Sequence, residues 1–365
     1  MALIGAMAPE LQAEFGFGDA ELGMIAALYF VPAIVLGRYG GMLVDRLGPA
    51  VGLRATGAIV IACLLVAATA ESFAMLLVGS FIGATSMALA TPASNVVLVH
   101  HVPEKHRGLA FGLKQSAVPL AATLSGLALP LIALRAGWRW AFAVMIVFPL
   151  ASLLLAPATP VEHRSVGEWP GVRLRPPRAL LLLAGVGVFA AMAVGTLNPF
   201  LVRAGIEAGF SAGAAGVVLS VAAASLIVTR VAWGAVLDRT GADPLRVIFL
   251  LLAVGSLGYA MLAAGTMVPF AIGAIIAYAF GWAWPGVQFL AGLRLWPENP
   301  GEATGILQMG AFLGATIGPL VFGVLAERIS FAAGYTASAV VAAVAAGLVA
   351  LLIRDVRRTR AACVA

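Results

Sequence analysis

Long apolar runs follow one another along almost the whole sequence, and they constrain the fold more than any other feature. Each run reaches about 20 residues, the length at which a helix crosses the ~30 Å hydrocarbon core of a bilayer. Because lipid offers no partner for backbone polar groups, such runs are expected to be helical. The chain is 62% hydrophobic and 10% charged, whereas soluble domains are about half apolar and a quarter charged. These features predict an all-α, multi-pass membrane protein. The predicted spans are residues 21–44, 51–70, 73–99, 108–134, 140–157, 179–201, 213–237, 245–265, 267–293, 303–325 and 331–353.

Basic residues are distributed unevenly between the two predicted sides of the membrane. The side that carries the 40–54, 100–107 and 238–246 loops, the 158–178 stretch and the C-terminus holds fourteen Lys or Arg residues. The other side holds four: Arg135, Arg139, Arg203 and Arg328. Because cytoplasmic loops are enriched in Lys and Arg, we expect a plasma (inner) membrane protein with a cytoplasmic C-terminus.

An internal repeat with an offset of 193 residues relates the two halves of the chain. The pairs Gly41–Gly234, Gly112–Gly305 and Gln115–Gln308 all obey this offset. Such a repeat predicts two pseudo-symmetric six-helix bundles of parallel orientation, related by an axis along the membrane normal. The predicted units are an N-terminal bundle (1–157), a cytoplasmic linker (158–178) and a C-terminal bundle with a basic tail (179–365).

The repeat also bears on the first span. The seventh span begins near Ala179, and the offset places the matching start before Met1. Residues 1–8 then match only the end of a helix. We therefore expect the first helix to be incomplete, with about 11.5 transmembrane helices in all.

A short motif, Gly-xxx-Asp-Arg-x-Gly, ends the second span of each half. Its residues are Gly41, Asp45, Arg46, Gly48 in the first half and Gly234, Asp238, Arg239, Gly241 in the second. GMLVDRLG and AVLDRTG resemble the loop motif of the major facilitator superfamily and its repeat. The family pattern continues with two basic residues, where Pro49 and Ala50 stand here.

The resemblance implies the fold and the mechanism of a secondary transporter. It also implies a gating latch at the cytoplasmic side, in which Gly41 and Asp45 pack on the eleventh helix and favour the outward-open state. The eleventh helix starts near Glu302, and its stretch GAFLGATIGP (310–319) resembles the glycine-rich stretch along which helices of the family slide.

Three cations lie at a similar depth inside predicted spans: Arg38, Lys114 and Arg230. Charges within the membrane are costly and are functional candidates by default. The sequence places no Asp or Glu deep in a span to neutralise them, so a hydrated cavity or an anionic substrate must do so. Arginine suits planar oxyanions because its fork bonds carboxylate in a bidentate manner. The alternative is that Arg38 and Arg230 snorkel or brace the bundle, as we expect of Arg294 at its helix end.

Uncharged polar side chains accompany these cations. Each can bond the substrate or only a neighbouring helix, and the sequence does not separate the two. They are Asn95, Gln115, Asn198, Gln288 and Gln308. Tyr29, Trp282 and Trp284 could shape a cavity, although single aromatic residues more often pack or anchor at the interface.

The leading hypothesis is a transporter that moves a small organic or inorganic anion by alternating access, driven by an ion gradient or by exchange. Coupling to a proton or to a counter-anion stays open. The arginines on the second and eighth helices are similar to those of the nitrate porters and organic-acid members of the superfamily. The fifth-helix sequence GLKQSAVPLAATLSG does not match the nitrate signature. The runner-up is a drug or metabolite efflux transporter, and a non-transporting membrane sensor is a third hypothesis.

Other site classes find little support in the sequence. No nucleotide-binding or hydrolase motif is present, so we expect no enzyme, no cofactor and no nucleic-acid partner. His100, His101 and His106 lie with Glu104 in one polar loop, which we interpret as solvated rather than as a metal site. Cys63 and Cys363 predict no disulfide. The partners we expect are the lipid bilayer and a small molecule, and we expect a monomer.

Overall fold

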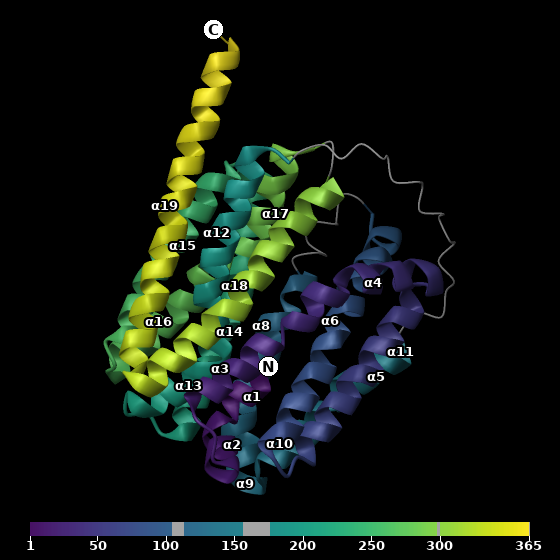
Figure 1. The fold of residues 1–365 in the computed structure, drawn as a ribbon, viewed down its shortest axis with the longest axis vertical. Helices are drawn as coiled ribbons and strands as arrows, with labels where there is room; N and C mark the ends of the chain where they lie inside the picture. Colours follow the sequence, from purple (N-terminus) through teal and green to yellow (C-terminus); the bar gives the residue numbers. More distant parts are fainter. Residues whose placement is uncertain (104–112, 156–175, 298–299, 365) are drawn as a thin grey trace.

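The structure is a computed structural model that describes residues 1–103, 113–155, 176–297 and 300–364 (Figure 1). It describes their side chains apart from those of residues 33, 37, 38, 45, 99, 100, 238, 300–302 and 358–364. Within these residues the regular structure is entirely helical, and ten helices are long and apolar enough to cross a membrane. The prediction of an all-α membrane protein is confirmed.

The helices of the first half are α1 (Ala2–Ala6), α2 (Ala8–Phe15), α3 (Asp19–Leu28), α4 (Val31–Leu47), α5 (Pro49–Ala68), α6 (Phe73–His101), α8 (Ala117–Ala128), the π-helical turn η2 (Leu129–Ala133), α9 (Leu134–Ala136), α10 (Trp138–Met145) and α11 (Val147–Leu155). Those of the second half are α12 (Arg178–Gly195), α13 (Leu197–Glu207), α14 (Ala212–Thr240), α15 (Pro244–Ala263), α16 (Met267–Ile276), the π-helical turn η3 (Ala277–Gly281), α17 (Trp284–Leu295), α18 (Pro300–Arg328) and α19 (Phe331–Val364).

The span predicted at 21–44 is built from two helices, α3 and α4, and is therefore not among the ten continuous ones. Pro32 stands at the start of α4, directly after the break at Tyr29 and Phe30. Proline has no N–H and its ring collides with the carbonyl of the preceding turn, which favours an interruption of the helix at this position. The apolar run predicted that this segment crosses the membrane, and the proline divides the segment into two helices.

Each half packs mainly within itself. In the first half α5 lies against α6 and α11, and in the second half α12 lies against α18 and α19. The glycines of the 310–319 stretch mediate this packing, because an added Cβ at Gly310, Gly314 or Gly318 would overlap backbone carbonyls of α12. The close partner of this stretch is thus a helix of its own half. Small residues allow such close backbone approach between membrane helices.

The two halves meet along two seams that obey the sequence repeat. In one seam, a Cβ on Gly23 of α3 would overlap the carbonyl of Pro319 in α18. In the other, Gly126 of α8 and Gly216 of α14 lie backbone against backbone. Gly23 and Gly216 are 193 residues apart, as are Gly126 and Pro319. The repeat read from the sequence is therefore a symmetry of the packing.

The two ends of the molecule differ in how the halves meet. At the end formed by α2, α9 and α13, which we call the closed end, side chains of the second half bond a side chain and a backbone N–H of the first half. At the opposite end, which we call the open end and where the C-terminus lies (Figure 1), Gly41 and Gly234 would meet no heavy atom within 4 Å of an added Cβ. The described contacts thus join the halves near one end and leave the motif glycines free near the other.

Candidate functional site

Lys114 and Asn95, both predicted as substrate-binding residues, lie in direct contact. The Nζ of Lys114 donates a hydrogen bond to the Oδ1 of Asn95, and it lies 3.5 Å from the backbone oxygen of Thr91. Thr91 and Asn95 are one turn apart on α6, and a helical carbonyl points toward the residue four positions later, so the two acceptors lie close together. The ammonium group is held by neutral oxygens between the fourth and fifth spans.

Arg230, on α14, bonds two backbone carbonyls. Its Nη1 donates to the oxygen of Gln115 at 2.6 Å, and its Nη2 donates to the oxygen of Trp282 at 3.3 Å. Gln115 belongs to the first half and Trp282 to the second. The guanidinium group therefore lies where three spans from both halves meet.

Both carbonyls are available because the helices that carry them are interrupted. The residue four positions after Gln115 is Pro119, which has no N–H to close the helical bond to that carbonyl. Trp282 follows η3 and precedes Ala283, the N-cap of α17. The first carbonyl that accepts a hydrogen bond within a helix is that of the N-cap residue. The Trp282 carbonyl precedes the N-cap of α17 and so takes no part in the hydrogen bonds of that helix. Discontinuous helices of this kind line the sites of many transporters.

Neither cation has a carboxylate partner among the described residues. The ion pairs that the structure describes join Arg139 to Glu14, Arg203 to Asp19, and Arg246 to Asp243. Hydrogen bonds to neutral oxygens stabilise a cation but do not supply the opposite charge that would compensate it. Among the described residues, the positive charges of Lys114 and Arg230 therefore have no acidic side chain to compensate them.

The other predicted polar residues have different surroundings. Asn198 accepts a hydrogen bond of 2.8 Å from the hydroxyl of Tyr278, and Gln288 donates one of 2.8 Å to the carbonyl of Leu183. Gln288 is 1% exposed and joins α17 to α12 inside the second half. Gln308 is half-buried. The side chain of Arg38 lies outside the described residues.

The last glycine of each motif lies at a helix end that requires a glycine. Gly48 and Gly241, which are repeat mates, end α4 and α14 with φ values of +86° and +62°. L-residues with a side chain rarely adopt such angles, so glycine is required at both helix ends. Arg46 and Arg239 are exposed. The side chains of Asp45 and Asp238 lie outside the described residues.

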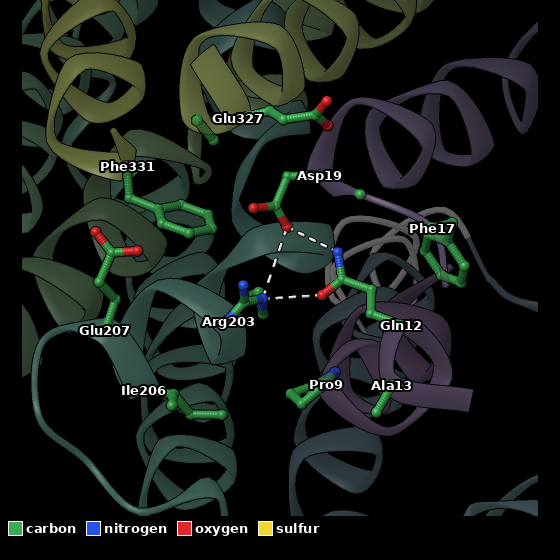
Figure 2. A pocket seen from close by; sticks show the side chains of 12 residues that line it. Pro9, Gln12, Ala13, Phe17, Asp19, Arg203, Ile206, Glu207, Glu327 and Phe331 are labelled. Atoms are coloured by element: carbon green, nitrogen blue, oxygen red, sulfur yellow. Dashed lines mark hydrogen bonds and ion pairs between the residues drawn. The ribbon is translucent and has the colours of Figure 1, made fainter. Parts of the chain in front are cut away.

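Sequence reasoning missed a cluster that joins the halves at the closed end. Arg203 of α13 donates from its Nε to the Oε1 of Gln12 at 2.9 Å, and lies 3.7 Å from the Oδ1 of Asp19 (Figure 2). Gln12 also donates to Asp19 at 2.8 Å. Glu327 of α18 accepts a bond of 2.7 Å from the backbone N–H of Ala20. We call Gln12, Asp19, Arg203 and Glu327 the closed-end cluster.

These residues line a pocket of about 580 Å³ between the halves. One wall comes from α2 and the start of α3, and the other comes from α13, α18 and the start of α19, including Glu207 and Phe331 (Figure 2). The only sequence signal for the cluster was charge at predicted span ends, because Asp19 and Arg203 are far apart in the chain. Their contact follows from the seam between α3 and α18.

Comparison with known families assigns the fold. The sequence profile described as "Major Facilitator Superfamily" matches residues 1–293 and 183–363. The chain belongs to the Major Facilitator Superfamily. The resemblance seen in the loop motif is thereby confirmed, and the protein is a multi-pass membrane transporter of this superfamily.

Individual relatives of this major facilitator are distant. It is 27% identical over 366 residues to an "MFS-type efflux pump" of Mycolicibacterium smegmatis, covering 89% of this chain and 80% of the relative. It is 26% identical over 152 residues to a "Probable sulfoacetate transporter SauU" of Cupriavidus necator, covering 42% of this chain and 35% of the relative.

Two solved structures share the fold. A bacterial homologue of the human lysosomal transporter Spinster, in an inward-facing and occupied conformation, matches with a TM-score of 0.71 at 18% identity, covering 97% of this chain and 93% of that one. The nucleoside transporter NupG, crystallised as a point mutant, matches with a TM-score of 0.71 at 15% identity, covering 96% of this chain and 94% of that one.

Proposed function

We propose that this major facilitator transports a small organic or inorganic anion by alternating access, with Lys114 and Arg230 as its principal binding groups. The observation that supports this proposal is that both cations bond only neutral oxygens in the described residues. An anion between them replaces water as the partner of two fixed charges. Asn95 and the Gln115 side chain, together with Arg38, are the proposed accessory groups.

The proposed transport cycle rocks the two halves about this site. The four basic residues of the sparsely charged side, Arg135, Arg139, Arg203 and Arg328, belong to helices of the closed end. By the positive-inside rule, that end faces away from the cytoplasm, and the C-terminus is cytoplasmic in an inner (plasma) membrane. The conformation described is then open toward the cytoplasm, with the closed-end cluster shut. The motif latch, centred on Gly41, engages in the opposite state.

The relatives bear on substrate and direction. The match to a probable sulfoacetate transporter supports an anion, although it spans 42% of the chain. The match to an efflux pump extends over 89% of the chain and supports a second candidate function, the export of a drug or metabolite. Export of an anion would agree with the names of both relatives, the efflux pump and the probable sulfoacetate transporter.

Uptake into proteoliposomes tests the proposal. Sulfoacetate, oxalate and nitrate serve as anionic probes, and a cationic dye serves as the probe for the second candidate. We expect flux of at least one anion, which Arg230→Gln and Lys114→Gln lower on the order of tenfold or more, the loss for one hydrogen bond to a charged group. Arg294→Gln is the matched control, because Arg294 is exposed at the end of α17.

Two results would overturn anion transport. One is transport of the cationic dye with no anion flux, which would favour the drug exporter. The other is full anion flux in both the Arg230→Gln and the Lys114→Gln variants.

A further inference from the structure

The bond from Arg230 to Gln115 connects the two halves of the transporter near the proposed anion site. It joins α14 of the second half to the fifth span of the first half at 2.6 Å. Its partner bond to Trp282 stays within the second half. Any rocking that separates the fifth span from α14 at this depth must stretch or break the Arg230–Gln115 bond.

The residues that make this connection are not repeated in the other seam. Arg230 corresponds to Gly37, which has no side chain to reach across. Gln115 corresponds to Gln308, but Pro119 corresponds to Phe312. Phe312 has an N–H that can bond the Gln308 carbonyl within its own helix. The Gln308 carbonyl therefore has a helical partner, which the Gln115 carbonyl lacks because of Pro119. The arginine and the proline that frees its acceptor occur together, in one of the two repeat-related seams.

We propose that Arg230 is an anion-released clasp between the halves, an inference that rests on the proposed anion transport. Without anion, Nη1 of Arg230 bonds the neutral carbonyl of Gln115 and resists rocking. A carboxylate, sulfonate or other oxyanion accepts bonds from guanidinium more strongly than a neutral carbonyl does. An anion that binds Arg230 therefore takes this donor, and the bond between the halves is lost.

The clasp has a consequence for the mode of transport. Without bound anion, the Arg230–Gln115 bond stays formed and the carrier changes slowly between its two conformations. With bound anion, the bond is lost and the two halves can rock. Transport is then an exchange of anions, in which anion on the far side accelerates uptake. Among the coupling modes open to this protein, the clasp selects exchange over net uptake.

Pro119→Ala tests the clasp without changing any charge. The new N–H can bond the Gln115 carbonyl within its own helix and so competes with Arg230 for it. Pro149→Ala is the matched control, since Pro149 lies on α11 and packs against Gly57 within the first half. Spin labels at Val51 and Arg246, which are exposed on opposite halves at the open end, report the separation of the halves in a background in which both native cysteines are replaced, Cys63→Ser and Cys363→Ser.

We expect two effects of Pro119→Ala and neither in Pro149→Ala. In anion-free protein the distribution of distances between the labels should shift, because the clasp is weakened. In proteoliposomes, the ratio of exchange to net uptake of the transported anion should fall on the order of tenfold, the effect of losing one hydrogen bond to a charged group. Arg230→Lys keeps a positive charge but loses the planar guanidinium group, so it should lower the ratio of exchange to net uptake as well. This variant replaces Pro119→Ala as the test if Pro119→Ala does not fold.

The outcomes separate this inference from the proposed function. Wild-type protein that moves none of the anions would refute the proposed function, and the anion-free label distances would still test the clasp. Anion transport in which Pro119→Ala and Arg230→Lys both keep the wild-type exchange ratio and label distances would refute the clasp alone.

Discussion

Glu327 caps a helix of the opposite half: its carboxylate accepts a 2.7 Å hydrogen bond from the backbone N–H of Ala20, 307 residues earlier in the chain. Ala20 lies in the first turn of α3, where N–H groups have no partner within the helix. A carboxylate at a helix N-terminus also interacts favourably with the helix dipole. The second half thus supplies both a bond and a charge that hold the closed end shut.

Glu327→Gln should therefore shift the protein away from the conformation with a shut closed end. The amide oxygen can still accept the bond, but the charge is lost, and the expected change in the equilibrium is about twofold to fivefold for an exposed helix terminus. Spin labels at Arg135 and Val268, exposed on opposite halves near this end, measure it. Glu71→Gln, which removes an exposed charge between α5 and α6, is the control, and an equal shift there would refute the capping role.

Gly126 and Gly23 should respond alike to an added methyl group, because they lie in the two repeat-related seams. A Cβ on Gly126 would overlap the carbonyl of Gly216 and the hydroxyl of Ser220. Overpacking typically costs about 1–3 kcal/mol, and here it acts on the conformation in which the seams are shut. We expect both Gly126→Ala and Gly23→Ala to lower thermal stability and to increase the label separation at the closed end.

Gly347→Ala is the matched control for these variants, since an added Cβ there meets nothing within 4 Å. A Gly126→Ala protein with wild-type stability and label distances would show that the seam is looser than described.

The crossings and their duplication could be predicted because they depend on properties that a sequence displays directly. Apolar length sets a span, and the 193-residue offset sets the pairing of seams, as Gly23 with Pro319 and Gly126 with Gly216 demonstrate. The break between α3 and α4 was also encoded, in Pro32. It was missed because hydropathy does not distinguish a broken helix from a continuous one.

The surroundings of the polar side chains could not be predicted, since they depend on how each helix is rotated about its axis. Gln288 and Asn95 are both amide side chains inside predicted spans, but Gln288 donates to the Leu183 carbonyl of α12, whereas Asn95 accepts a bond from Lys114. Packing against neighbouring helices sets this rotation. The closed-end cluster was hidden for a related reason: Asp19 and Arg203 approach only after both halves have folded and docked.

Gln288→Leu should destabilise the second half without changing substrate affinity. The variant keeps the approximate volume and loses the 2.8 Å bond to the Leu183 carbonyl. Hydrogen bonds between membrane helices contribute about 0.6 to 2 kcal/mol, so a modest fall in thermal stability is expected. Uptake measured against anion concentration should give an unchanged KM. A raised KM with unchanged stability would instead support the substrate-binding role predicted for Gln288.

Glu14 should give the protein a stability that depends on pH. Its carboxylate bonds Arg139 at 2.6 Å and also accepts a 2.6 Å bond from the indole N–H of Trp138. The bond from Arg139, and after it the bond from Trp138, lowers the pKa of the Glu14 carboxyl below its usual range. The side chains of Arg139 and Glu14 are 44% and 38% exposed, so solvent screens the pair and its contribution is at most about 1 kcal/mol.

Because the pKa of Glu14 is lower in the folded protein, the unfolded chain binds the proton more readily. The stability that the ion pair contributes is therefore fully present above the usual carboxyl pKa, and it disappears as the pH falls through the lowered pKa of Glu14. Glu14→Gln should therefore melt below wild type at pH 7, and the gap should narrow in acid. Arg139→Gln should lose the same pH-dependent part of the stability, and the double variant should lose little more of that part, because the ion pair is removed only once. Melting of detergent-solubilised protein from pH 7 to pH 4 measures all three variants. A gap that stays constant over this range would assign the effect to the bond from Trp138 and to packing, rather than to the charge of Glu14.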